Sequence, residues 1–185
     1  MEHKLTGEEM YRKINQKRRL TSLFTLIAIL IALLFDLFIG SSGMSLKDII
    51  VVLWQGPGVK SIETSIIWNI RLPMTLICLT VGASLGLAGT QMQTILANPL
   101  LTAGAVAFVG TIGFIGLVAP HFARYFAGED QRYLAPMASL FGVLLITFAS
   151  ILAKLIIPGI IIPIGIVTSL VGVPFLVFLI IRKGV

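Results

Sequence analysis

The stretch from Leu72 to Ala123 contains no Asp, Glu, Lys or Arg, so His121 is its only residue that can carry a positive charge. A helix crosses a hydrocarbon core of ~30 Å with about 20 consecutive apolar residues. The stretch is therefore long enough for two crossings, yet it offers no charged loop between them. Of the 185 residues, 57% are apolar and 12% are charged, which excludes an ordinary soluble domain and predicts an integral membrane protein.

The apolar residues form about five segments, which predict an all-α, polytopic membrane helical bundle. We place these segments at residues 20–39, 72–96, 104–119, 134–157 and 160–181. The third is marginal, because a helix of that length spans only ~24 Å, and glycines interrupt it at Gly110, Gly113 and Gly116. We treat residues 20–185 as a single transmembrane domain that follows a basic tail at residues 1–19.

The basic residues predict the orientation of the chain. The tail holds Lys4, Arg12, Lys13, Lys17, Arg18 and Arg19, and an excess of Lys and Arg marks the cytoplasmic flank of a membrane helix. We therefore expect a cytoplasmic N-terminus. A signal peptide is the competing interpretation, but the apolar run after the tail exceeds the ~7–15 residues of such a peptide. A net charge of +6 could indicate a nucleic-acid partner. We predict none, because the basic residues lie mainly near the N-terminus.

Polar residues inside the apolar segments are few. Asp36 lies near the outer end of the first segment, where we expect a solvated carboxylate, and Lys154 lies near a helix end, from which it can reach the membrane interface. Gly82 and Gly86 are four residues apart, a spacing that favours close packing of two helices. Gln93 needs a hydrogen-bond partner or water, so it contributes either to helix contacts or to a water-lined pathway.

Two features interrupt the apolar pattern after residue 96. Asn98 precedes Pro99, and the residue before a proline is pushed away from helical geometry. Residues 120–133 read PHFARYFAGEDQRY and predict a polar loop that contains Pro120, His121 and Arg124. This loop either caps a helix end at the membrane interface or takes part in coupling to a partner, and the sequence favours neither.

The chemistry of an enzyme is missing from the sequence. It contains no HExxH, CxxC or GxxxxGK[ST] motif, and no pair of carboxylates lies within one apolar segment. The single cysteine, Cys78, lies in an apolar run, and the two histidines stand far apart, so we expect no metal and no cofactor. Any transport would have to draw its energy from another subunit.

Several blocks of the sequence resemble the permease subunits of ABC importers for iron-siderophores, haem and cobalamin. The blocks occur in the order found in that family: IRLP at 70–73, VGASLGLAGTQMQ at 81–93, NPL at 98–100, GTIGFIGLVAPHFAR at 110–124, EDQRYLAP at 129–136 and PIGIVTSLVGVPF at 163–175. The resemblance implies a shortened version of the ten-helix permease fold, located in the bacterial cell membrane. The central region of the family is missing, and residues 100–106 resemble the junction left by its absence.

The resemblance also implies partners and roles for individual residues. It implies an ABC ATPase, an extracellular or periplasmic substrate-binding protein, a second permease subunit and membrane lipid. Arg71 and Lys154 match positions that contact the binding protein, whereas Gly82, Gly86, Gln93 and Asn98 match positions near helix packing and the pathway. The missing central region includes the loop that docks on the ATPase. Two hypotheses therefore remain open: a shortened importer permease, or a non-transporting remnant or regulatory or scaffolding membrane subunit.

The junction raises a topological question. The resemblance places Asn98 and residues 120–132 on the same cytoplasmic side, so residues 104–119 would leave and return as a re-entrant hairpin, which requires cover by protein or water. The alternative is one short outward span, which would place Arg182 and Lys183 outside against the charge bias. We favour the first arrangement.

Overall fold

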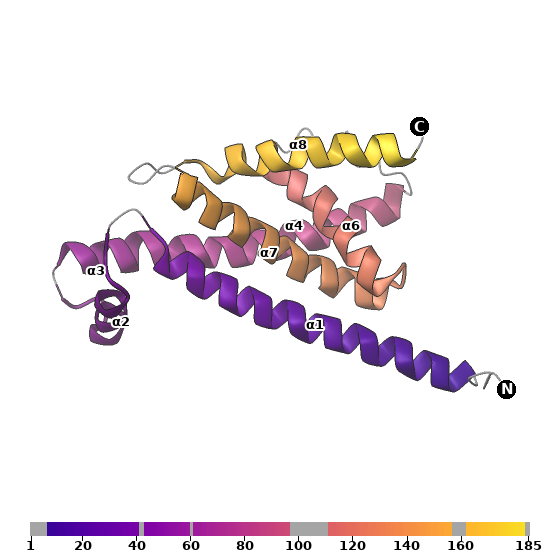
Figure 1. Ribbon diagram of the computed structural model, residues 1–185, viewed down its shortest axis with the longest axis horizontal. Helices are drawn as coiled ribbons and strands as arrows, with labels where there is room; N and C mark the ends of the chain where they lie inside the picture. Colours follow the sequence, from indigo (N-terminus) through magenta and orange to yellow (C-terminus); the bar gives the residue numbers. More distant parts are fainter. Residues whose placement is uncertain (1–6, 41–42, 60, 97–110, 157–161, 184–185) are drawn as a thin grey trace.

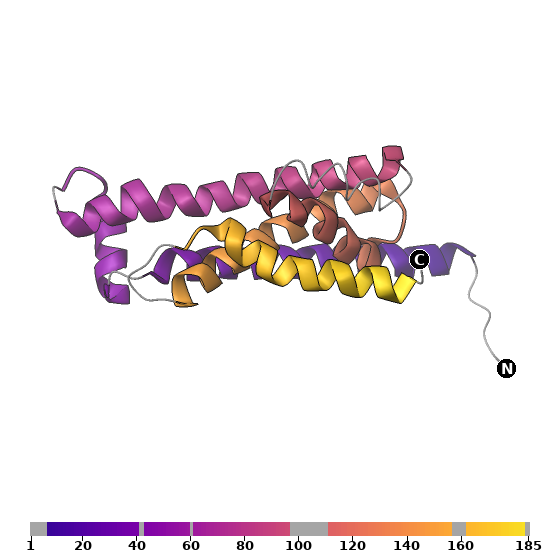
Figure 2. The ribbon, with the colours of Figure 1, turned by 90° about the horizontal axis from the view of Figure 1, so that it is seen from above.

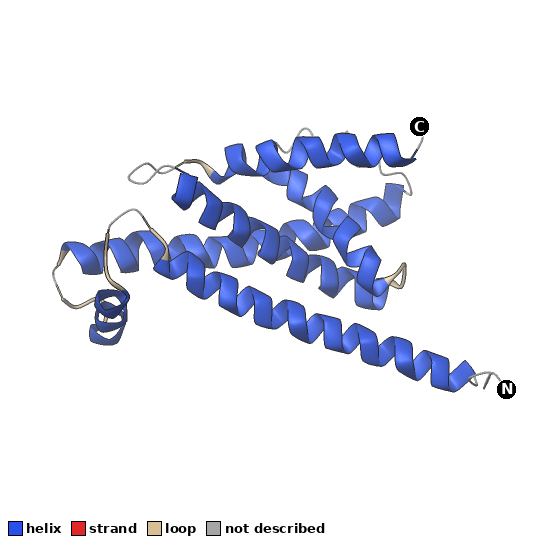
Figure 3. Ribbon diagram, in the orientation of Figure 1, coloured by secondary structure: helices blue, strands red, loops and turns tan. Residues whose placement is uncertain are grey.

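A computed structural model of the chain describes residues 7–40, 43–59, 61–96, 111–156 and 162–183. All regular secondary structure in these ranges is helical (Figure 3). The predicted all-α polytopic bundle is therefore confirmed. Among the described residues, three helical stretches are long and apolar enough to cross a membrane: Met10–Phe38, Ile62–Leu96 and Gln131–Ile156.

The first helix, α1, spans Gly7–Phe38 and begins well before the apolar segment predicted at 20–39. The basic residues of the tail continue the helix because Lys, Arg, Gln and Glu lose little side-chain freedom in it. At 1.5 Å per residue, its 32 residues extend about 48 Å, considerably more than a hydrocarbon core. Its N-terminal end projects beyond the other helices (Figure 1).

The segment after α1 forms a small helical cap at one end of the bundle (Figure 1). Helix α2 spans Leu46–Gln55, and Ser45 and Asp48 form a capping box at its start. Gly56, at a φ of 76°, supplies the left-handed turn that ends α2. Helix α3 (Ile62–Ile66) follows and continues through the π-helical turn η1 (Ile67–Arg71) into α4 (Leu72–Leu96).

The second half of the chain contains the 3-10 turn η2 (Thr111–Phe114) and helices α6 (Ile115–Ala127), α7 (Gln131–Ile156) and α8 (Ile164–Lys183). The prediction of a polar loop at 120–133 is wrong for residues 120–127, because α6 continues to Ala127. Proline removes one backbone hydrogen bond from a helix, but buried Ala119, Ala123 and Ala127 give α6 one apolar face that packs on the bundle. The actual turn is short and begins at Gly128, with a φ of 73°.

Helix α7 lies at the centre of the bundle and packs against α1, α4, α6 and α8 (Figures 1 and 2). Ion pairs join Arg18 to Asp130 and Asp36 to Lys154, so α1 and α7 run in the same direction. Close contacts of Gly82 with Val143 and of Gly86 with Ala138 show that α4 runs antiparallel to α7. Helix α8 returns antiparallel to α7, so the chain ends at the same end of the bundle as the start of α1 (Figure 1).

Helix α6 begins part-way along the bundle and not at its end. Ile115 and Ala119 form one apolar cluster with Cys78 of α4 and Ile146 of α7. Helices α4 and α6 then end at the same end of the bundle, where Gln131 Nε2 donates a hydrogen bond to Thr94 Oγ1. The choice between the re-entrant hairpin and the single outward span depends on the course of residues 104–110, so the favoured arrangement stays a prediction. Residues 104–110 and the predicted junction at 100–106 lie outside the described residues.

Candidate functional site

The charge cluster, which we define as Asp36, Arg71, Thr75 and Lys154, joins α1, α4 and α7. The Asp36 carboxylate is fully buried. Lys154 Nζ donates to Asp36 Oδ1 at 2.7 Å and to the Asp36 carbonyl oxygen at 2.8 Å. Thr75 Oγ1 donates to the other carboxylate oxygen, Oδ2, at 2.7 Å. Each oxygen of this buried carboxylate therefore has a donor from a different helix, as a buried charge requires.

Arg71, the last residue of η1, completes the cluster immediately before α4. Its Nη1 atom donates to the carbonyl oxygens of Leu37 at 3.1 Å and Phe38 at 3.2 Å. The last carbonyls of a helix lack partners within the helix and carry a partial negative charge. Arg71 and Lys154 thus act together as a cationic cap for the C-terminus of α1. Gly40 makes room for this cap, because a Cβ atom there would lie 2.5 Å from Arg71 Nη2.

The expectation of a solvated Asp36 is wrong. Its carboxylate has no exposed surface, because α1, α4 and α7 converge around it and Lys154 neutralises it. Lys154 likewise points to Asp36 instead of to an interface. Asp36 and Lys154 are each an isolated charge in an apolar segment. Because an unpaired charge in a membrane is costly, the sequence already indicated that each needs a partner of opposite charge.

Arg71 and Lys154, the residues predicted to contact a binding protein, are directed inward. The exposed fraction is 6% for Arg71 and 17% for the Lys154 side chain. In this conformation neither cation forms an outward patch. The charged residues exposed at this end, within the described ranges, include Lys47, Asp48 and Glu63.

Gly82 and Gly86 lie in the contact between α4 and α7. A Cβ atom on Gly82 would lie 2.5 Å from Val143 Cα, and one on Gly86 would lie 2.6 Å from the Ala138 carbonyl carbon. Gly142 of α7 faces the carbonyl oxygen of Gly82 in return. The glycines thus let the two backbones approach at van der Waals distance, which is how small residues stabilise membrane helix pairs.

Gln93 lies in the contact between α4 and α6. Its side chain is 8% exposed, and Nε2 donates to the Leu117 carbonyl oxygen at 3.3 Å. One turn earlier, Gly89 packs directly against the carbonyl oxygen of Gly116. That oxygen lacks the usual helical donor because residue 120 is proline. Gln93 therefore connects two helices, while Asn98, the other polar residue predicted near the pathway, lies outside the described residues.

The end of the bundle opposite the helical cap contains Pro120, His121 and Arg124 within α6. Pro120 is buried, whereas His121 and Arg124 are partly exposed. Arg124 Nε lies 3.3 Å from Glu129 Oε2 in the following turn. Nearby, Arg18 pairs with Asp130 at 3.3 Å and lies 4.7 Å from the centre of the Tyr133 ring. These contacts connect the start of α1 to the α6–α7 turn.

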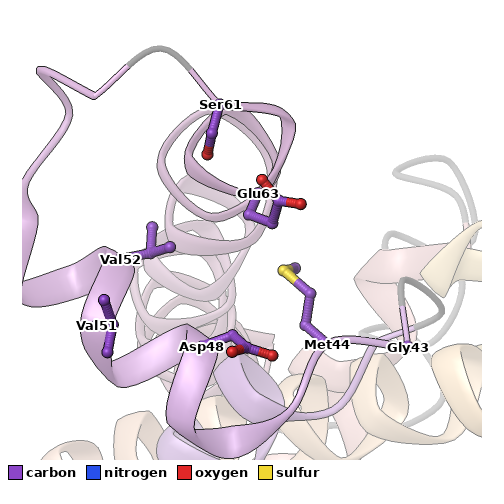
Figure 4. Close-up of a pocket in the computed structure, with 7 residues that line it drawn as sticks. All are labelled: Gly43, Met44, Asp48, Val51, Val52, Ser61 and Glu63. Carbon is purple, nitrogen blue, oxygen red and sulfur yellow. The ribbon is translucent and has the colours of Figure 1, made fainter.

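An open cleft lies in the helical cap between α2 and α3 (Figure 4). Seven residues line it: Gly43, Met44, Asp48, Val51, Val52, Ser61 and Glu63. Both carboxylates lie in the first turn of a helix, where negative charge is stabilised. Asp48 Oδ2 also accepts a hydrogen bond from the Ser45 backbone N–H at 3.0 Å. Their positions are thus explained by the helices that they cap.

The described residues contain no constellation for catalysis or metal binding. No group of three His, Cys, Asp or Glu side chains among them could hold a metal ion. Residues 82–86 read GASLG, which fits the G-x-S-x-G pattern of hydrolases. That pattern is functional at a sharp turn between a strand and a helix, whereas Ser84 lies inside α4 and donates to the Thr80 carbonyl oxygen.

The fold and these contacts define a short polytopic membrane bundle with an interior of close helix contacts and one buried charge cluster. The chain belongs to the FecCD transport family, since the sequence model of that family matches residues 27–104 and residues 100–182. This is a family of transporter permeases and not of enzymes. No solved structure matches the chain.

Relatives show how much of a family member this chain contains. It is 32% identical over 167 residues to the iron(3+)-hydroxamate import system permease protein FhuB of Bacillus subtilis, covering 86% of this chain and 44% of FhuB. It is 41% identical over 93 residues to the hemin transport system permease protein HmuU of Yersinia pestis, covering 50% and 28%. An uncharacterized ABC transporter permease protein of Bacillus subtilis, YvrB, is 45% identical over 93 residues, covering 50% and 26%. The chain thus spans less than half the length of these relatives.

Proposed function

We propose that this chain is a shortened permease subunit of an ABC importer for an iron-siderophore or a related chelate such as haem or cobalamin. The observation that supports this most directly is the family match in two parts. The parts meet at residues 100–104, inside the junction predicted at 100–106. Relatives named for iron-hydroxamate and hemin import support the substrate class.

The charge distribution supports a cytoplasmic N-terminus. Exposed Arg12, Lys13, Lys17 and Arg19 lie on the first turns of α1. The start of α7, whose first turn contains exposed Arg132, lies at the same end of the bundle as the end of α8 (Figure 1). The opposite end buries Arg71 and pairs Lys154 with Asp36. An excess of free cations on one side favours that side as the cytoplasmic one, in a cell membrane of the bacterial type.

The partners of such a permease would be an ABC ATPase at the inner end, a substrate-binding protein at the outer end and a second permease subunit. Residues 120–132 are the best candidate for contact with the ATPase, because α6 and its following turn reach the inner end of the bundle. His121 and Arg124 lie on the part of α6 nearest that turn. Large exposed apolar side chains on α1, such as Phe24, Leu30 and Phe35, are suited to lipid.

The second candidate function is that of a non-transporting remnant or a regulatory or scaffolding subunit. The length of the chain favours it, since the chain spans 26% to 44% of the three relatives described above. Such a subunit would pair with an intact permease through its helices without coupling to ATP hydrolysis.

Co-purification with the cognate ATPase in detergent distinguishes the two functions. This chain is compared with a matched chain that carries the central region of a full-length relative at residues 100–106. A stable stoichiometric complex with both chains supports the importer. Binding by the restored chain alone contradicts it and supports the non-transporting subunit.

A further inference from the structure

We propose that Lys154 and Thr75 form a carboxylate-binding site at the outer end of the bundle and that Asp36 occupies this site from within the chain. Asp36 is then a positioning residue, which holds Lys154 inward and connects the end of α1 to α4 and α7. The inference rests on the geometry of the charge cluster and does not depend on transport activity.

The donor arrangement is that of a site for a carboxylate. Lys154 Nζ and Thr75 Oγ1 approach different oxygens of the Asp36 carboxylate, both at 2.7 Å. Donors at this distance form charge-assisted hydrogen bonds, which are about twice as strong as neutral ones. The two donors come from α7 and α4, whereas the carboxylate comes from α1. The occupied site therefore requires that α1, α4 and α7 pack together.

The charges of the cluster favour a carboxylate over a neutral group. Lys154 pairs directly with the Asp36 carboxylate, and Arg71 donates to the carbonyl oxygens of the two residues that follow Asp36. Removal of the Asp36 carboxylate would leave Lys154, whose side chain is 17% exposed, without its anionic partner. A free carboxylate that entered the vacated space would restore the neutralised pair, and a neutral solute of the same size would not.

The position of the site gives it a consequence for docking, and this part rests on the proposed function. Lys154 matches a family position for contact with the binding protein, but its side chain is only 17% exposed and points to Asp36. An acidic residue of a partner would have to displace Asp36 to reach it. In the conformation described here, Asp36 therefore masks Lys154 from an acidic partner.

Chemical rescue tests the site directly. The variant Asp36→Ala is purified in detergent, and its melting temperature is measured in sodium formate and in sodium chloride at equal ionic strength. Breaking a buried ion pair from one side is strongly destabilising, so we expect a loss of about 6 °C or more in chloride. Formate should recover at least half of this loss, because a ligand that binds only the folded state stabilises it.

The second measurement is the reactivity of Lys154 with a reagent that is soluble in water and modifies amines. If Asp36 had a purely structural role, formate would not change this reactivity. In the wild type, we expect modification of exposed Lys47 and protection of Lys154. Asp36→Ala should expose Lys154 in chloride and protect it again in formate. The matched control is Asp48→Ala, which removes an exposed carboxylate at the same end and should leave Lys154 protected in both salts.

The proposal is overturned if formate has no effect on both readouts of Asp36→Ala, or if Lys154 of the wild type is as reactive as Lys47. If Asp36→Ala does not fold, Asp36→Asn preserves the shape of the side chain and removes its charge. Lys154 should then become reactive in Asp36→Asn, and a Lys154 that stays protected there contradicts the role given to the carboxylate. Formate should have no effect on Asp36→Ala combined with Lys154→Met, which lacks the cation; a shift there equal to that of Asp36→Ala also overturns the site.

Discussion

A close contact between the backbones of α4 and α7 gives the sharpest stability prediction, and the perturbation is Gly86→Ala. A Cβ atom at this position would lie 2.6 Å from the Ala138 carbonyl carbon and 2.9 Å from Ser139 Cα, and closer still to the Ala138 carbonyl oxygen. All three are atoms of the α7 backbone, so no side chain can rotate away. The two helices must separate to accept one methyl group.

The magnitude follows from the cost of overpacking. One extra methyl group in a tightly packed interior costs about 1–3 kcal/mol, and we expect the upper half of that range because backbone is displaced. A change of 1 kcal/mol shifts the melting temperature of a chain of this size by about 2–4 °C. We therefore expect Gly86→Ala to melt about 4–12 °C lower than the wild type.

The assay is thermal unfolding in detergent, followed by the fraction of protein that remains monodisperse on size-exclusion chromatography. The matched control is Gly58→Ala in the helical cap, because a Cβ atom there would meet no atom within 4 Å. It should melt within about 2 °C of the wild type, since surface changes rarely exceed ±0.5 kcal/mol. A Gly86→Ala protein as stable as this control would refute the close approach of α4 and α7.

Two further substitutions test the charge cluster and the α4–α6 contact by the same assay. Arg71→Lys should lower the melting temperature by about 3–6 °C, because an ammonium lacks the guanidinium geometry that reaches both α1 carbonyls. The control Lys47→Arg, in the exposed cap, should leave the melting temperature unchanged. Equal stability of the two variants would contradict the capping role of Arg71. Gln93→Glu should be less stable than Gln93→Leu, because a carboxylate would face the Leu117 carbonyl without a donor. The same two substitutions at exposed Gln91 should not differ in this way. A Gln93→Glu protein more stable than Gln93→Leu would contradict the hydrogen bond.

Much of the helical content could be predicted from the sequence. The apolar segment predicted at 72–96 has the bounds of α4, and the one predicted at 134–157 matches α7 to within three residues, because hydrophobic length is a local property of the chain. The basic tail was expected to precede the first helix, but the helix starts at Gly7, because charged residues with long side chains are themselves good helix formers. The polar loop at 120–133 was predicted from Pro120 and the charges, and packing of α6 on its neighbours outweighed both signals.

The candidate site was less predictable. Gly82 and Gly86 were expected in a helix contact from their spacing, and the structure places both against α7. Asp36 was expected in solvent, although an isolated carboxylate in an apolar segment already indicated a partner elsewhere in the chain. The partner could not be identified, because Asp36 and Lys154 are separated by 118 positions and no local pattern relates them.

The sequence by itself determined that this chain is a membrane bundle of several helices, because apolar length and the distribution of basic residues depend only on residues near one another. It also determined the family, because each matching block is a continuous run of residues in the sequence. Only the tertiary structure decided that α6 starts within the bundle and that Arg71 and Lys154 point inward. Both depend on which helices become neighbours, and that choice is made by long-range packing and by the need to neutralise a buried charge.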